Sequence, residues 1–165
     1  MKRINKLFLP LLLTLTSLSA YDKSYSFIGV QTDVSKIDKI ETSSVGLKYG
    51  IQHKNARTSI SINYAKKGAD TFQSAILQID MGVFKKAFKE LPFKPYIGLS
   101  VGVLQRENDA FIKEDRGLVY GANTGLAYIV NDSFDLDLGY RYLKTSSLET
   151  IDEINNVNLS LHYFY

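Results

Sequence analysis

Hydrophobic side chains alternate with small or polar ones along almost the whole chain from Tyr21 to Tyr165. This period of two is typical of β-strands whose two faces meet different surroundings. Turn-rich segments interrupt the pattern and divide it into eight predicted strands, at about 24–34, 44–53, 57–66, 73–84, 95–105, 117–129, 133–144 and 156–165. The pattern therefore predicts one all-β domain built as an antiparallel up-and-down barrel.

The connections between the predicted strands differ at the two ends of the barrel. Those after strands one, three, five and seven are mostly longer and charged, with loops at 35–43, 106–116 and 144–155. Two of the other three connections, HKNA and VNDS, are tight. Short turns on one side and longer loops on the other are typical of barrels that span the bacterial outer membrane, and an even strand number places both chain ends on the periplasmic side.

One face of these strands is apolar around the whole circuit and carries no charged residue. An example is the row Leu118-Tyr120-Ala122-Thr124-Leu126-Tyr128. The other face holds nine glycines, at positions 29, 46, 50, 82, 98, 102, 121, 125 and 139. Because the interior of an eight-stranded barrel is only just wide enough to be filled by side chains, the apolar rows are expected to face outward, towards lipid.

Aromatic residues gather near the ends of the apolar rows. Tyr64, Tyr120, Tyr140 and Tyr142 lie towards one predicted rim, and Tyr128 and Phe134 towards the other. Amphipathic rings are enriched where hydrocarbon meets headgroups. The positions therefore predict two aromatic girdles, one at each membrane surface.

The first twenty residues predict a cleaved secretory signal peptide, because a basic start is followed by a short apolar run and small residues. The mature domain would then be 21–165. The whole chain has 20 basic and 17 acidic residues, and residues 1–20 hold three basic ones, which leaves 17 of each sign. This balance gives no reason to expect nucleic acid as a partner. With two histidines and no cysteine, no metal site or cofactor is expected.

The predicted inward face carries ionisable residues that would be costly in a membrane unless paired. These are Lys48, Asp80, Asp135, Asp137, Arg141 and His162. Simple pairing across the last hairpin places Arg141 near Asn158 and Asp137 near His162, and Lys48 within reach of Asp80. We expect a hydrogen-bonded plug that fixes the barrel's shape, in preference to an ion pathway, because eight strands leave little free lumen. Ser160 and His162 share this face and raise a lipid-modifying enzyme as a further hypothesis.

The segments KPYIGLSVGV, GLVYGANTGLAYIVNDSFDLDLGYRY and NLSLHYFY resemble the small outer-membrane β-barrel proteins, the group that contains the OmpA transmembrane domain, the OmpX/Ail barrels and the opacity-type porins. The resemblance implies a Gram-negative outer-membrane location and contact with outer-membrane lipids and lipopolysaccharide. It also implies a C-terminal signal, Leu159, Leu161, Tyr163 and Tyr165, that is read by the outer-membrane assembly machinery. A surface ligand could bind the loops 35–43, 106–116 and 144–155.

A shared fold does not give a shared function. The leading hypothesis is a non-enzymatic barrel with a structural or surface-interaction role. A narrow porin-like channel is the alternative, an outer-membrane lipid-modifying enzyme ranks third, and a soluble periplasmic binding barrel ranks fourth.

Overall fold

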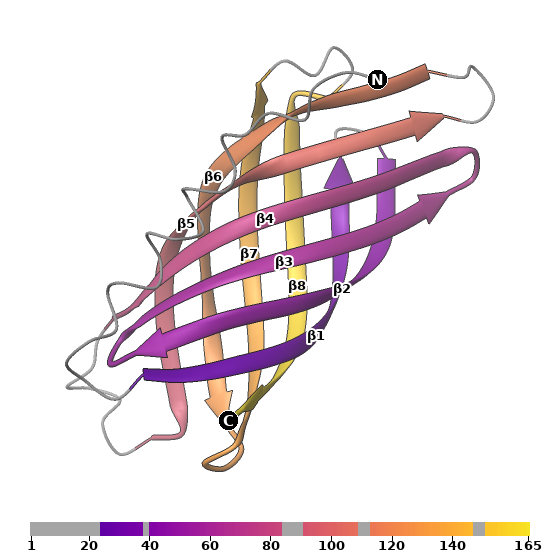
Figure 1. Ribbon diagram of the computed structural model, residues 1–165. Coiled ribbons are helices and arrows are strands. Elements are labelled where there is room, and N and C mark those ends of the chain that lie inside the picture. Colours follow the sequence, from indigo (N-terminus) through magenta and orange to yellow (C-terminus); the bar gives the residue numbers. More distant parts are fainter. Residues whose placement is uncertain (1–23, 38–39, 84–90, 109–112, 147–150) are drawn as a thin grey trace, which may run out of the picture.

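The computed structural model describes residues 24–37, 40–83, 91–108, 113–146 and 151–165. These residues form eight antiparallel strands, each hydrogen-bonded to its neighbours in the sequence, and the last strand pairs with the first. The result is the closed up-and-down barrel that the alternation predicts (Figure 1). The strands are β1 (Ser24–Ile37), β2 (Ile40–His53), β3 (Ala56–Lys67), β4 (Asp70–Gly82), β5 (Phe93–Asn108), β6 (Lys113–Ile129), β7 (Phe134–Ser146) and β8 (Glu153–Phe164).

The strands are longer than predicted at one end of the barrel. We call the end at which β1 begins and β8 finishes the C-terminal end, and the other the opposite end. At the opposite end β1 continues to Ile37 and β2 resumes at Ile40, β5 and β6 are separated by four residues only, and β7 and β8 by six. The prediction of loops over 35–43, 106–116 and 144–155 is therefore wrong for most of their residues. Only 38–39, 109–112 and 147–150 fall outside the described residues.

The loop prediction is wrong because it treats charged residues as a mark of loops. At the opposite end they instead continue the hydrogen-bonded pairing of the strands. Lys36 lies opposite Glu41 across β1 and β2, and Lys144 lies opposite Glu153 across β7 and β8. Opposite charges in directly facing positions stabilise a strand pair. The β3–β4 connection is a two-residue turn in which Gly68 adopts a φ of 60°, a conformation that favours glycine.

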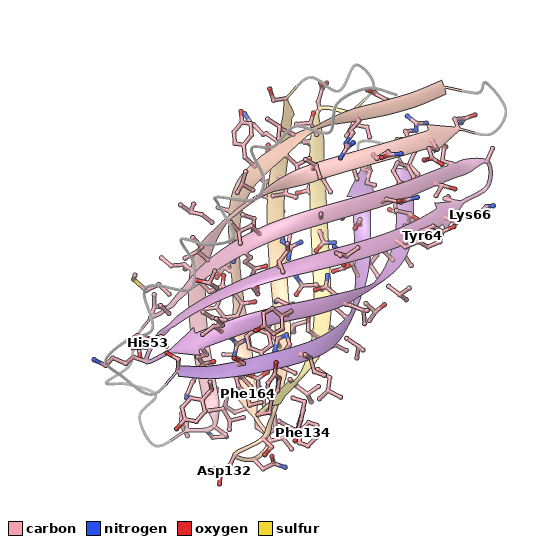
Figure 2. All side chains as sticks on the ribbon, in the orientation of Figure 1. His53, Tyr64, Lys66, Asp132, Phe134 and Phe164 are labelled. Atoms are coloured by element: carbon pink, nitrogen blue, oxygen red, sulfur yellow. The ribbon has the colours of Figure 1, made fainter. Side chains whose placement is uncertain are left out.

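The two faces of the barrel wall follow the predicted division. Outward positions are exposed and apolar, with Leu47 68% and Leu99 70% exposed. Inward positions are buried and largely polar, among them Gln31, Ser59 and Ser100. The side chains therefore form an apolar surface around a polar interior, the reverse of a protein folded to face water (Figure 2).

The interior is not polar throughout. At the opposite end, nine inward or loop side chains pack into one buried group, which we call the apolar cluster: Ile37, Ala65, Phe72, Ile76, Leu104, Val119, Leu143, Ile151 and Ile154. Its members come from seven strands, apart from Ile151, which lies two residues before β8 begins. Hydrocarbon therefore occupies much of the lumen at this end, beside buried polar side chains such as Asp33, Ser44 and Asn156, and a gap of about 50 Å³ remains between them. The sequence pattern did not predict this cluster.

No described segment forms a helix of the length and apolar character that crossing a membrane requires.

Candidate functional site: the barrel interior

The six residues predicted for the inward network all face the interior and are buried. Lys48, Asp80, Asp135, Asp137, Arg141 and His162 are each at most 3% exposed. They come from β2, β4, β7 and β8, so the barrel brings together groups that are far apart in the sequence. Buried charges are stable only when they are paired or hydrogen-bonded, so the partners of each group decide what the interior can do.

The central cation of the interior is Arg57, which the sequence interpretation did not include. Its guanidinium lies 2.5 Å from Asp135 Oδ2 and 3.2 Å from Asp137 Oδ2, so one cation bridges two carboxylates. It also donates a hydrogen bond of 2.9 Å to Gln52 Oε1. Because β3 and β7 lie on different sides of the closed ring, Arg57 ties two walls of the barrel together.

Arg57 is the second residue of β3 and directly follows a tight turn, where a basic side chain is usually solvated. The sequence signal that identifies it as inward is its position in the alternation. It shares the inward face with Ser59, Ser61 and Asn63, all of which are buried. The rings of Phe27 and Phe164 cover the guanidinium, with their centroids 5.2 and 5.8 Å from its central carbon.

A second set of hydrogen bonds surrounds Asp80. Gln78 Nε2 and Asn123 Nδ2 donate to its carboxylate at distances of 2.5–3.0 Å. Gln78 in turn accepts a hydrogen bond of 2.7 Å from Arg141 Nη2. Tyr96, a buried side chain on β5, donates a hydrogen bond of 2.8 Å to Asp137 Oδ1 and so joins the set around Arg57. We call the residues of both sets, with Lys48 and His162, the polar network.

The partners within the network differ from those predicted. The β7–β8 register places His162 opposite Asp135, Ser160 opposite Asp137 and Asn156 opposite Arg141. The predicted pairing is therefore off by two residues. Lys48 and Asp80 do not form the expected ion pair: Asp80 is held by amides, and no salt bridge of Lys48 occurs among the described residues.

Ser160 and His162 do not form the hydrogen bond that an activated serine needs. His162 Nδ1 lies 2.7 Å from Asp135 Oδ1, whereas Ser160 Oγ and His162 Nε2 have no hydrogen-bond partner in the described part of the chain. Both side chains are at most 1% exposed. A nucleophile must reach its base and its substrate, and this pair reaches neither. Across the described residues no group of His, Cys, Asp and Glu has the arrangement of a metal site.

The residues predicted for the aromatic girdles lie at the two ends of the outward rows. Tyr64, Tyr120, Tyr128, Phe134 and Tyr140 are exposed, and Tyr142 is partly buried. In the predicted C-terminal signal, Leu159, Leu161, Tyr163 and Tyr165 are all exposed on one face of the final strand. Tyr163 packs beside Phe134 with ring centroids 5.1 Å apart.

A cavity of about 590 Å³ occupies the C-terminal half of the barrel. Its floor is made of Arg57, Asp80, Tyr96 and Asp135 from the polar network. Its rim is made of turn and strand-end residues, which include Tyr25, Gln52, Lys54, Lys94, Asn131, Asp132 and Phe164. The interior therefore opens at the C-terminal end, narrows at the polar network and is largely occupied by the apolar cluster at the opposite end.

No protein-family model matches the chain, and no curated protein matches it in sequence. Solved structures do match. Neisserial surface protein A is similar over 86% of this chain and 97% of its own, with a TM-score of 0.68 and 16% identity. Outer membrane protein H of Pseudomonas aeruginosa is similar over 86% of this chain and 99% of its own, with a TM-score of 0.65 and 17% identity. The N-terminal barrel domain of OprF from the same species is similar over 87% of this chain and 100% of its own, with a TM-score of 0.58 and 12% identity.

Similarity at this level of identity concerns the fold. The matches cover the barrel from end to end and agree in strand number and closure with the resemblance inferred from the sequence. This chain therefore has the fold of the small eight-stranded outer-membrane β-barrel proteins.

Proposed function

We propose that this protein is an integral outer-membrane barrel with a non-enzymatic role, structural or in surface interaction, and that it does not pass solutes. The observation that carries the proposal is the inverted distribution of polarity. Outward rows of Val, Leu, Ile and Tyr are exposed around the whole wall, while Lys48, Asp137 and Arg141 are buried inside it.

This distribution is unfavourable in water and favourable in a bilayer. Soluble monomers seldom expose apolar patches larger than a few hundred Å². Here the exposed rows run over all eight strands, with residues such as Val45, Ile62 and Leu99 more than 60% exposed. A closed barrel leaves no unpaired strand edge, so its backbone is satisfied in hydrocarbon. In this proposal residues 1–20 direct export, and the face that carries Leu159 and Tyr163 is read during assembly.

The surface role rests on the length of the strands. A tilted strand needs roughly 9–11 residues to cross the hydrocarbon core, whereas β5 has 16 and β6 has 17. Beyond Tyr64 on β3 and beyond Leu118 on β6 the outward positions become charged, with Lys66 and Arg116 exposed. At the opposite end the paired strands therefore continue past the predicted aromatic girdle. The charged rim is suited to contact lipid and lipopolysaccharide headgroups and any surface ligand.

The first experiment tests location. Cells are fractionated, the outer membrane is extracted with detergent, and the protein is run on a gel with and without heating. We expect recovery in the outer-membrane fraction and faster migration of the unheated form, because a closed barrel stays compact in detergent. Recovery of the mature protein only in the soluble periplasmic fraction would refute the proposal.

The second experiment separates this role from the channel alternative. Two barriers in series close the interior, the polar network and the apolar cluster, so removing one leaves the other in place. In planar bilayers we expect no steady conductance from the unmodified protein, Arg57→Ala or Leu143→Ala, and stable steps only when both substitutions are combined. Stable steps from the unmodified protein that change on Arg141→Ala would establish a channel.

A further inference from the structure

The cavity at the C-terminal end has the size of a ligand site. Its volume of about 590 Å³ lies within the range of roughly 300–1,000 Å³ that is typical of small-molecule sites. Some eight-stranded barrels hold one small ligand, although in others side chains fill the whole interior. The cavity is a dead end, because the polar network forms its floor and the apolar cluster occupies much of the lumen beyond. Such a space retains a ligand instead of conducting it.

The floor offers a ligand few free groups. The Arg57 guanidinium is committed to Asp135, Asp137 and Gln52. Both oxygens of Asp80 accept hydrogen bonds, and the Tyr96 hydroxyl donates to Asp137. A buried network of this kind is costly to disturb. A ligand is therefore recognised at the rim, where hydrogen-bonding groups remain available.

The available groups at the rim are mainly donors. Gln52 uses its Oε1 to accept from Arg57, and its NH₂ group makes no hydrogen bond to a described residue. Asn131 Oδ1 likewise accepts hydrogen bonds from the backbone N–H groups of Ser133 and Phe134, which leaves its NH₂ group as a donor. The exposed Lys94 ammonium has no partner among the described residues. Three rim groups thus supply N–H donors, and one of them is a cation.

Much of the remaining wall is apolar or aromatic. Tyr25 and Phe164 line the cavity, together with Pro95 and Ile129, beside the polar Lys54 and Asn55. Among the described residues of the rim, the carboxylate is that of Asp132, which lies at the tip of the β6–β7 connection and points away from the barrel (Figure 2). An anion with several acceptor oxygens can accept hydrogen bonds from the available donors of the rim, and an apolar group can pack against the aromatic rings.

From these observations we propose that the cavity binds a small carboxylate with an apolar or aromatic body, such as an acylated amino acid or the end of a short peptide. The carboxylate lies at Lys94 with the amide of Asn131, and the apolar body lies against Tyr25 and Phe164, beside the amide of Gln52. The proposal relies on the proposed function only for the direction the cavity faces, which is the periplasm.

Two substitutions test separate parts of this site. Gly82 lines the cavity, and a Cβ added there would meet only Asn55, at 3.4 Å and beyond. Gly82→Leu therefore adds an apolar side chain to the cavity without removing a charge. Lys94→Gln removes the charge proposed to hold the carboxylate and keeps a donor. The matched control is Lys66→Gln, which removes an exposed lysine at the opposite end (Figure 2).

The experiment uses the full mature chain refolded in detergent micelles, with amide resonances followed during titration with N-acetylphenylalanine. We expect saturable changes at Gly82, Lys94 and Ala127 and none at Tyr64 or Lys66. The neutral amide of the same compound, and acetate alone, should bind more weakly. Lys94→Gln should weaken binding about two- to fivefold, as expected for an exposed ion pair, and Gly82→Leu by about tenfold or more. Lys66→Gln should have no effect.

Three results would overturn the inference. One is the absence of saturable change up to about 10 mM, ten times a millimolar dissociation constant. Another is equal binding of N-acetylphenylalanine and its amide, because the carboxylate would then have no role. The third is undiminished binding by Gly82→Leu that still migrates as a folded barrel. Binding is measured on the folded barrel, whereas location is measured by fractionation, so the two proposals fail separately.

Discussion

The two halves of the barrel interior close the same lumen by different physical means. In the C-terminal half Arg57 bridges Asp135 and Asp137, and the charges surround a cavity. In the opposite half Phe72, Leu143 and their neighbours pack into the apolar cluster, beside polar side chains such as Asp33 and Asn156. Both halves are built from the inward positions of the same eight strands. The comparison shows that a barrel can combine a polar section, which fixes which walls face each other, with an apolar section, which adds stability.

The two halves should respond differently to substitution. An apolar side chain that is removed leaves a void, and the cost depends on how far the surroundings relax. A charge that is removed from a buried pair leaves its partner uncompensated, and the cost is large although the intact pair adds little net stability. Substitutions in one half at a time test this difference. The free energy of unfolding is measured in urea from the gel mobility of the folded barrel.

The largest effect is expected from Arg57→Ala. It leaves the carboxylates of Asp135 and Asp137 buried without their cation, which costs about 3–5 kcal/mol. The control is the triple variant with Asp135→Asn and Asp137→Asn, which removes the two charges as well. It should be more stable than Arg57→Ala alone. If the triple variant is the less stable of the two, the two carboxylates do not depend on Arg57 for compensation.

On the apolar side, Leu143→Ala should cost about 2–5 kcal/mol, because a side chain that is 2% exposed leaves a cavity inside the cluster. Leu47→Ala is the matched control: it removes the same atoms from an outward position that is 68% exposed. It leaves no internal cavity and should cost less. Equal losses for the two variants would mean that the apolar cluster is not a packed core.

A smaller effect is expected from Tyr96→Phe, which removes one hydrogen bond to a charged group, Asp137, and keeps the ring. The loss should be about 1.5–3 kcal/mol. In the background of Asp137→Asn the same substitution should cost less, and this difference measures the coupling between the two side chains. Additive losses in the double variant would show that the 2.8 Å contact contributes nothing to stability.

The sequence alone predicted the barrel and its inverted faces because alternation is local and survives uncertainty about where strands end. It did not predict the partners. A register shift of two residues keeps every side chain on its own face, so no alternation pattern can tell Asp135 from Asp137 as the neighbour of His162. The pairing depends on the lengths of the connections, which the charged residues after β1, β5 and β7 obscured.

The apolar cluster was missed for a related reason. Ile37 and Ile154 sit within segments that were expected to be loops, and so their inward parity was not used. Val119 and Leu143 lie on the inward face among glycines and polar residues, where single apolar positions do not stand out. Only closure of the ring brings these separate side chains together, and closure is a long-range property.

The smallest effect concerns an ion pair outside the predicted girdles, between Arg106 and Asp70 at the opposite end. Arg106 Nε lies 3.0 Å from Asp70 Oδ1, and the hydrogen bond from Arg106 holds the pKa of Asp70 below its usual value. A carboxyl with a lowered folded-state pKa adds stability above its unfolded pKa of about 3.9 and loses it as the pH falls through the folded value. Both side chains are partly exposed, so the contribution at pH 7 should be below about 1 kcal/mol. Arg106→Gln should lower the urea midpoint slightly at pH 7, and its effect should fade as the pH falls through the lowered folded pKa of Asp70 and the carboxyl is protonated in the native state as well. A loss as large as that of Arg57→Ala would mean that burial does not set the difference between the two ion pairs.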